Sequence, residues 1–249
     1  RYAVEHDTMD TTFRSMYLGL SSFMDANPER RELLLGQRPP RFDMAYEDRI
    51  TRTTDDFERV ALKAEAACDY FLLVGPPGTG KTSRALRRMV EHFYACPSTQ
   101  VLLLAYTNRA VDEICRSLSA ILPQVDYIRV GSELSCDARF RKHLLENVLA
   151  ECNNRREVNI RMADCRIYVG TVASIASKPE LFKLKHFDVA IVDEATQILE
   201  PQLLGILCAR FKDGRNGIGK FILIGDHKQL PAVVLQSNEQ SEVHEILYQ

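Results

Sequence analysis

Residues 75–82 form a short loop whose composition strongly limits the fold around it. The loop reads Gly75-Pro76-Pro77-Gly78-Thr79-Gly80-Lys81-Thr82 and matches the pattern G-x-x-x-x-G-K-T at every fixed position. Glycines let backbone N–H groups wrap close to clustered negative charge, and a lysine ammonium adds a point charge. An apolar run at 71–74 precedes the loop, and apolar residues at helical spacing follow it over 85–93. A strand, a loop and a helix in this order predict a site for the phosphates of a nucleotide.

The last two residues of this loop carry its chemistry. Lys81 is expected to bind the β and γ phosphates, and the Thr82 hydroxyl is suited to ligate Mg²⁺. The alternative is a glycine-rich turn that fits by accident. Four fixed positions match by chance in roughly one chain of this length in a hundred. The strand and helix on either side disfavour that alternative further.

Composition excludes several classes of protein. The chain has 249 residues, of which 45% are hydrophobic and 27% charged, as in a globular protein with a substantial core. No apolar run approaches the ~20 residues that cross a bilayer. The formal net charge of −2 provides no global attraction for nucleic acid, so such binding must use local contacts. The seven cysteines are scattered and include no C-x-x-C pair, which predicts a reducing, cytoplasmic location without a disulfide framework or zinc site.

The remainder of the chain alternates between strand-like and helix-like segments. Most strand candidates are continuous apolar runs, typical of strands buried on both faces of a parallel sheet. We therefore predict an α/β fold with a doubly wound parallel sheet and with ligands at the carboxyl ends of its strands. The polar stretch 136–164 is predicted to be a helical insertion. The strand candidates are 71–74, 101–105, 126–130, 166–170, 188–192 and 220–224, and helix candidates include 82–95, 109–121 and 198–209.

The first 53 residues show helical patterns and no strand-like run. Helical spacing of apolar residues over 13–24 predicts one helix, and Asn27-Pro28 predicts the N-cap and first position of a second, which Gly36 closes. The segment 37–41, Gln-Arg-Pro-Pro-Arg, is the best linker candidate. We predict a helical appendage of unknown role at 1–53 and a nucleotide-binding domain at 54–249, which opens with a helix over about 55–68.

Two further strand ends carry candidate functional groups. Asp193 and Glu194 end the apolar run 189–192. A carboxylate there can hold Mg²⁺ opposite the Thr82 hydroxyl of the phosphate-binding loop. A second carboxylate can accept a proton from the water that attacks the γ-phosphate. An Asp-Glu pair on a solvated surface is the disfavoured alternative. Asp226 and Gln229, after the run 221–224, are suited to sense the γ-phosphate, although a plain surface turn explains that pattern equally well.

Four motifs, taken together, resemble those of a known family. GPPGTGKT, YTNRAVDEI, DEATQ and GDHKQLP are similar, in order and spacing, to motifs I, Ia, II and III of superfamily 1 helicases. The alanine of DEATQ and the GDHxQLP pattern resemble the branch that contains the nonsense-mediated-decay RNA helicase and the flap-processing replication helicase–nuclease. The resemblance covers about residues 54–235 and implies a RecA-like motor domain that uses ATP and Mg²⁺.

The resemblance implies a role for each matching residue. Catalysis would involve Lys81, Glu194 and Gln229, and the metal would be held by Thr82 and Asp193. The nucleotide would be bound by the whole loop 75–82 together with Asp226. Single-stranded DNA or RNA would be contacted by Thr107, Asn108 and Thr171. Helix capping is the alternative role for these last three residues, and both roles can coexist.

The chain departs from the family pattern in two places. The family usually places an adenine-reading glutamine about eighteen residues before the first loop glycine, where this chain has Phe57. The second RecA-like domain, with motifs IV to VI and the arginine finger, lies outside these 249 residues and is an expected partner. Because an arginine finger contributes ~10³ to 10⁵ in turnover, we expect the chain alone to bind nucleotide but to hydrolyse it barely above background.

Three functional hypotheses follow from these motifs. The first is the N-terminal motor half of an ATP-dependent DNA or RNA helicase. The second is a regulatory P-loop ATPase without nucleic-acid activity. The third is a nucleotide-gated binding or scaffold module, against which the intact Glu194 argues because a mere binder needs no catalytic base.

Overall fold

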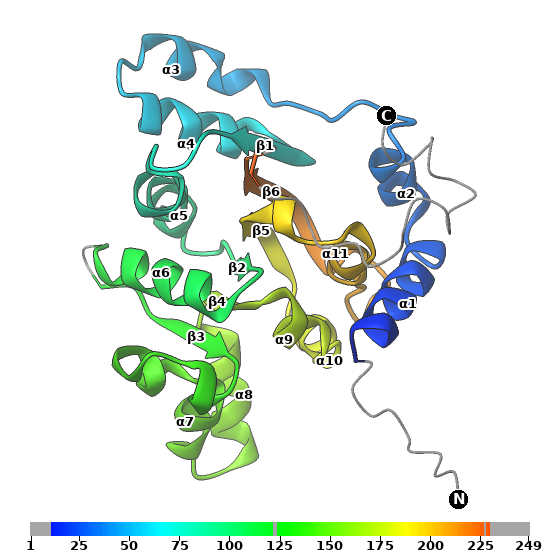
Figure 1. The fold of residues 1–249 in the computed structure, drawn as a ribbon, viewed down its shortest axis with the longest axis vertical. Helices are drawn as coiled ribbons and strands as arrows, with labels where there is room; N and C mark the ends of the chain where they lie inside the picture. Colours follow the sequence, from blue (N-terminus) through cyan, green and yellow to red (C-terminus); the bar gives the residue numbers. More distant parts are fainter. Residues whose placement is uncertain (1–10, 122–123, 227, 230–249) are drawn as a thin grey trace, which may run out of the picture.

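A computed structural model describes residues 11–121, 124–226 and 228–229, and the chain builds a six-stranded parallel sheet in them (Figure 1). The strand order is β1-β6-β5-β2-β4-β3, and every pairing is parallel. The predicted α/β fold is confirmed, and each predicted strand overlaps an observed one. The strands are β1 (Tyr70–Val74), β2 (Val101–Ala105), β3 (Tyr127–Val130), β4 (Ile167–Thr171), β5 (Phe187–Asp193) and β6 (Ile218–Gly225).

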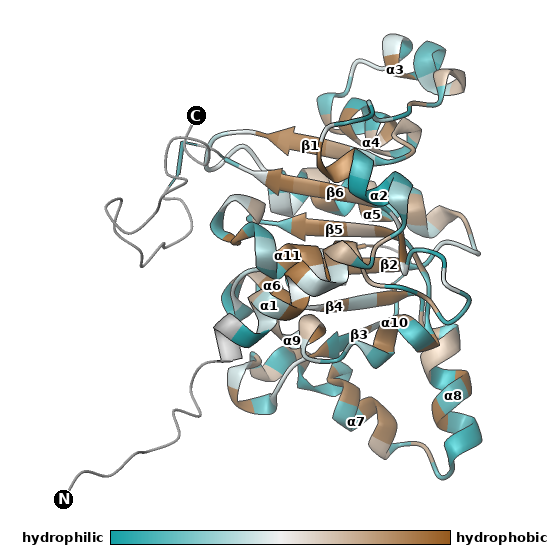
Figure 2. Ribbon diagram, turned by 90° about the vertical axis from the view of Figure 1, so that its right-hand side faces the viewer, coloured by the Kyte–Doolittle hydropathy of each residue, from teal (hydrophilic) through white to brown (hydrophobic). Residues whose placement is uncertain are grey.

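Helices cover both faces of this sheet. Figure 1 shows α4 (Asp56–Ala66), α5 (Arg87–Ala95) and α6 (Asn108–Ser119) on one face. The opposite face carries α9 (Val172–Ala176), α10 (Glu180–Leu184) and α11 (Glu200–Leu207). Alternate residues of β2 enter the two cores, Leu103 on the α5 side and Leu102 on the α11 side. Because helices cover both faces, the strands are mainly apolar, as the brown colour of most of their length in Figure 2 shows.

The helix after the phosphate-binding loop begins irregularly. The sequence predicts a single helix over 82–95, whereas residues Lys81–Leu86 (η2) form π-helical turns before α5 begins. The amide of Ala85 donates to the Gly80 carbonyl, five residues back, at 2.9 Å. Such wide turns are rare and occur often at functional sites.

The predicted insertion contains short helices beyond the β3 edge. They are the 3₁₀ turns η3 (Glu133–Ser135) and η4 (Ala138–His143), followed by α7 (Leu145–Ala150) and α8 (Arg155–Asp164). None of the residues of α8 is buried. This polarity agrees with the sequence pattern, but the 3₁₀ turns were not predicted because short turns carry no periodic signal.

Four described helical segments precede α4: α1 (Thr11–Met24), α2 (Pro28–Leu34), η1 (Met44–Tyr46) and α3 (Glu47–Arg52). Asn27 occupies the predicted N-cap position, but its side chain does not cap α2 and donates instead to Asn216 Oδ1 at 3.0 Å. The sequence did not predict η1 and α3. Among the described residues α1 is the longest helix, with 14 residues, and no helix there is long and apolar enough to span a membrane.

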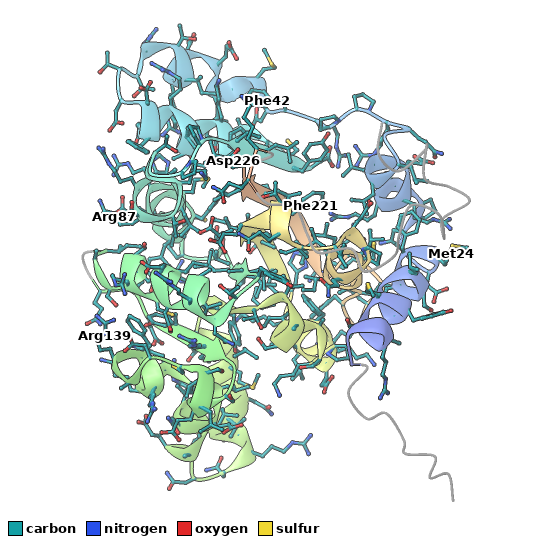
Figure 3. All side chains as sticks on the ribbon, in the orientation of Figure 1. Met24, Phe42, Arg87, Arg139, Phe221 and Asp226 are labelled. Atoms are coloured by element: carbon teal, nitrogen blue, oxygen red, sulfur yellow. The ribbon has the colours of Figure 1, made fainter. Side chains whose placement is uncertain are left out.

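The first two helices pack against the domain that carries the sheet. Helix α1 lies along α11, where Gly19 and Gly205 approach closely. The Arg30 guanidinium of α2 is buried at 3% exposure and donates to the carbonyls of Ile218 and Gly219 at 2.7 and 2.9 Å. It also lies 5.4 Å from the ring centre of Phe221, near the middle of the molecule (Figure 3). The boundary at residue 53 stays a prediction, although α1 and α2 share buried surface with the sheet.

A methyl group at Gly19 should disrupt the packing of α1 on α11. A Cβ there would lie 1.9 Å from the carbonyl oxygen of Pro201, a backbone atom that cannot move aside cheaply. We expect Gly19→Ala to lower the free energy of unfolding by about 1–3 kcal/mol, as overpacking does. Gly131→Ala is the matched control, because nothing lies within 4 Å of a Cβ at Gly131. Chemical denaturation of both variants measures the difference, and equal stabilities would contradict the close approach.

Candidate nucleotide-binding site

The parallel register gathers the predicted functional residues at one edge of the sheet. Val74 pairs with Gly225 across β1 and β6, and Ala105 of β2 pairs with Asp193 of β5 on one side and Thr171 of β4 on the other. Five strands therefore end at the same level. The residues that the motifs singled out are either the last residues of these strands, as Thr171 and Asp193 are, or lie in the segments that follow them, as expected for the carboxyl edge of a doubly wound sheet.

Two glycines give the phosphate-binding loop its shape. Gly78 and Gly80 have φ angles of 77° and 82°, in the left-handed region that favours glycine. Thr79 lies between them and donates its hydroxyl to the carbonyl of Pro76 at 2.8 Å. This internal hydrogen bond closes the loop on itself, so its curvature does not depend on a ligand.

Lys81 extends over the same loop. Its ammonium donates to the carbonyl of Pro76 at 2.8 Å and to the carbonyl of Gly75. Lysine is a flexible point charge with three donors, so these carbonyl contacts can be exchanged for phosphate oxygens. The side chain is therefore placed where the motif requires a positive charge.

Thr82 and Asp193 meet across the site. The Thr82 hydroxyl donates to Asp193 Oδ2 at 2.5 Å, and the other carboxylate oxygen accepts from the Glu194 amide at 3.0 Å. Asp193 is only 2% exposed, and burial raises the pKa of its carboxyl group. A hydroxyl and a buried carboxylate are hard oxygen donors that a divalent cation would compensate, so the pair fits Mg²⁺.

Glu194 has a strained backbone beside this pair. Its φ of 53° makes it the one non-glycine residue with positive φ in the part of the chain that the structure describes. Burial, and then the negative charge of Asp193, raise the pKa of its carboxyl group. Backbone strain of this kind costs on the order of 1–3 kcal/mol and clusters at functional sites.

The turn after β6 packs against the turn after β5. Asp226 is 6% exposed, and its side chain accepts from the amide of Lys228 at 2.9 Å (Figure 3). Its carbonyl accepts from the Gln229 amide at 3.1 Å. A Cβ at Gly225 would lie 2.8 Å from the Thr196 side chain, so a glycine is needed for this close approach.

A pocket of about 480 Å³ joins these groups. The predicted residues in its lining are Pro77, Gly78, Gly80, Lys81, Thr82, Asp193, Glu194, Asp226 and Gln229. Sequence reasoning missed Ser83, Ala110, Glu113, Ser117, Thr196, Gln197 and Gly225. Thr196 and Gln197 belong to the same DEATQ motif, and the spacing 110, 113 and 117 along the predicted helix is the signal that could have found the α6 residues.

The three candidate nucleic-acid residues lie outside this lining. Thr107 accepts from the amide of Ala110 at 3.1 Å and caps α6, which begins at Asn108. Thr171 accepts from the amide of Ser174 at 3.0 Å and forms a capping box that begins α9. The capping role that the sequence left open is therefore present for both threonines. Their contact with nucleic acid stays a prediction.

The fold and the pocket define a P-loop nucleotide-binding domain of the α/β class. A family model described as AAA domain matches residues 53–166 and 153–237. The chain belongs to this family, and its curated relatives confirm the resemblance to superfamily 1 helicases of the branch indicated by the motifs.

These relatives are much longer proteins. The DNA replication ATP-dependent helicase/nuclease JHS1 of Arabidopsis thaliana is 28% identical over 97% of this chain and 18% of its own length. The DNA replication ATP-dependent helicase/nuclease DNA2 of Bos taurus is 31% identical over 87% of this chain and 21% of its own length. The Homo sapiens DNA2 is 34% identical over 67% of this chain and 15% of its own length. The chain therefore spans about a fifth of the relatives it matches.

Neutralising Glu194 should stabilise the protein at neutral pH. Its pKa is raised in the folded chain, so deprotonation is easier in the unfolded chain, and a rise in pH above the ordinary value of 4.5 favours unfolding. We expect Glu194→Gln to unfold at a higher temperature than the parent at pH 7. Below pH 4.5 the gain should shrink, because the carboxyl group is then protonated in both states.

The control is Glu113→Gln, in the same pocket. The Glu113 carboxylate is 45% exposed and pairs with Arg116 at 2.5 Å, so its neutralisation should bring no gain. Thermal unfolding without nucleotide at several pH values measures both variants. A stability gain for Glu194→Gln that is independent of pH would contradict the assigned cause.

Proposed function

We propose that this chain is the ATP-binding and ATP-hydrolysing motor domain of an ATP-dependent DNA or RNA helicase. The observation that carries the proposal is the 2.5 Å contact between the Thr82 hydroxyl and the buried Asp193 carboxylate, inside the pocket that also holds Lys81. It joins the phosphate-binding loop to the acidic strand end, which is the arrangement that phosphoryl transfer requires. Family membership and the helicase relatives support the same function.

The ligand is proposed to be ATP with Mg²⁺. Thr82 and Asp193 would hold the ion, and the bound ion would neutralise charge on the β and γ phosphates. In the described ranges no group of three or more His, Cys, Asp or Glu side chains could hold a metal. A magnesium ion shared with phosphates needs only one or two protein ligands, so the pair suffices.

Other residues of the pocket would bind the phosphates, activate the attacking water and respond to the γ-phosphate. Lys81 would exchange its carbonyl contacts for phosphate oxygens. Glu194 would accept the proton of the attacking water, and its raised pKa suits a base better than that of an ordinary carboxylate. Gln229 and Asp226 end the neighbouring strand and would respond to the γ-phosphate.

Hydrolysis by the chain alone is proposed to be slow. Lys81 is the only cationic side chain among the described residues that line the pocket. Charge on the transferred phosphoryl group would then lack the arginine that contributes ~10³ to 10⁵ in turnover. We propose that a second RecA-like domain of the same protein supplies it.

Single-stranded DNA or RNA is the proposed polymer substrate. Thr107 and Asn108 follow β2, whose last residue pairs with Asp193, and Thr171 ends the next strand. The proposed nucleic-acid contacts therefore adjoin the proposed metal ligand across neighbouring strands. A cytoplasmic location is also proposed, and the free thiols of all seven cysteines support a reducing compartment.

Removing the Thr82 hydroxyl should weaken nucleotide binding only when Mg²⁺ is present. Thr82→Val keeps the side-chain shape but leaves the Asp193 carboxylate without its hydroxyl donor and the ion without a ligand. We expect the Kd of ATP to rise by on the order of tenfold or more in Mg²⁺ and to change little in EDTA. Ser83→Ala, an exposed neighbour in the same pocket, is the control. Isothermal titration in both buffers decides, and an equal loss in EDTA would contradict the metal role.

Nucleic acid should stimulate hydrolysis only in the larger assembly. We expect the 249-residue chain to hydrolyse ATP barely above background, and turnover that Lys81→Ala abolishes would contradict this. With the proposed second domain present, single-stranded DNA or RNA oligonucleotides should raise the rate. No stimulation by either polymer would favour a regulatory ATPase, and an ATPase rate unchanged by Glu194→Gln would favour a nucleotide-gated binding module.

A further inference from the structure

A second pocket, of about 250 Å³, lies at the edge of the sheet opposite to the nucleotide site. It adjoins the amino end of β3, because its lining includes His143 and Gln124, which precedes that strand. The His143 ring stacks on Tyr127, the first residue of β3, with ring centres 4.0 Å apart. Helix α6 contributes Arg116 and Ser119, from its last turn, to this pocket. In the described part of the chain the two pockets have no lining residue in common.

Positive charge dominates the lining of this second pocket. In the described ranges its lining contains the cations Arg116, Arg139 and Lys142 and no carboxylate. Arg139 lies on η4, at the left of Figure 3. Burial, and then the positive charge of Lys142, lower the pKa of the His143 imidazole, which lines the same pocket. We call this site the basic pocket, because a further positive charge is disfavoured there.

The cations of the basic pocket can exchange their present contacts for a ligand. Arg116 pairs with Glu113 at 2.5 Å, and Arg139 pairs with Asp137 at 2.6 Å. These four side chains are between 30% and 61% exposed, and ion pairs with such exposure contribute little to stability. Lys142 is exposed and has no carboxylate partner among the described residues. All three cations are therefore available to an anion.

The chemistry of the basic pocket fits a single phosphate group. A phosphate monoester carries nearly two negative charges near neutral pH and has three acceptor oxygens. Guanidinium groups bind such oxygens through parallel hydrogen bonds, and a lysine adds a point charge. The Ser119 hydroxyl and the Gln124 amide are further donors in the lining. A carboxylate has only two oxygens and one charge, so it would leave part of this cationic lining without a partner.

Two features disfavour a strand of nucleic acid as the ligand. Base stacking requires exposed aromatic faces, but Phe140 is only 6% exposed and the half-buried His143 ring has one face against Tyr127. A strand would also carry further phosphates past the pocket, where the carboxylates of Glu113 and Asp137 lie beside the cations and would repel them. An isolated phosphate on a side chain avoids both conflicts.

We propose that the basic pocket binds a phosphorylated serine or threonine side chain of a partner protein. Arg116 and Arg139 exchange Glu113 and Asp137 for the phosphate oxygens, and Lys142 supplies the third positive charge. The contact is non-covalent, so no bond forms or breaks. The basic pocket lies at the amino edge of the sheet, and its ligand is independent of the function proposed for the carboxyl edge.

The test uses phosphoserine peptides with the 249-residue chain. A library of nine-residue peptides with a central phosphoserine and randomised neighbours is passed over the immobilised chain, beside the same library without phosphate. We expect retention only of phosphorylated peptides, with inorganic phosphate as a much weaker competitor. The most strongly retained peptide is then titrated into each variant. Arg139→Ala and Lys142→Ala should each raise its Kd by on the order of tenfold, because each removes a charged donor.

The matched control is Arg141→Ala, which removes a cation from the same turn. Arg141 pairs with Glu133 at 3.0 Å and lies outside the lining of the basic pocket, so its loss should leave the Kd unchanged. Thermal unfolding verifies that each variant is folded.

Four results would overturn the proposal. Equal retention of the unphosphorylated library would remove the role of the phosphate, and equal losses in Arg139→Ala and Arg141→Ala would reduce binding to general charge attraction. Inorganic phosphate that binds as tightly as the selected peptide would make the pocket a site for a free anion. A single-stranded oligonucleotide with a 5′-phosphate that binds more tightly than the peptide, and that Arg139→Ala weakens, would make nucleic acid the ligand.

Discussion

The parallel register of the sheet is the constraint on which the site depends. Because β1, β6, β5, β2 and β4 all run in one direction and end at one level, five loops meet at a single edge. A slip of two residues between β5 and β6 would move Asp193 by about 7 Å along the strand relative to β1 and the loop that follows it. The 2.5 Å contact with Thr82 would then be lost. The apolar composition of the strands, which buries both faces, therefore also positions the polar chemistry at their ends.

The same edge accumulates features that oppose folding. Asp193 is buried, Glu194 has a left-handed backbone, and both carboxyl groups have raised pKa values because charge is disfavoured there. A domain selected for stability alone would replace both residues. The burial of the two carboxyl groups and the backbone strain become useful only when a cation and a polyphosphate bind. The cation would then neutralise negative charge on both the carboxylates and the phosphates inside the pocket.

The strands and the phosphate-binding loop could be predicted from sequence because their signals are local. An apolar run such as 101–105 is stable only when it is buried. The loop glycines Gly78 and Gly80 adopt positive φ angles, which favour glycine whatever lies around them. Glu113 and Ser117 enter the pocket only because α6 packs beside η2, which depends on contacts distant in sequence. The sequence predicts that Asn27 caps α2, but its side chain donates instead to Asn216, 189 residues away. Tertiary partners of this kind have no signature in a single sequence.

The N-terminal helices carry no recognised motif, but α2 contacts one of the strands that end at the site. Arg30 is a buried cation whose burial lowers its pKa. Among the described residues its Nη1 has no hydrogen-bond partner, so the bonds that Nη2 donates offset only part of the cost of burial. Two of its hydrogen bonds go to carbonyls at the amino end of β6, the strand that carries Asp226 at its other end. Separating α2 from the sheet would leave those carbonyls without these donors and expose the apolar contacts of α11. The helices thus support a strand of the site from the opposite edge of the sheet, which gives them a structural role independent of any recognised motif.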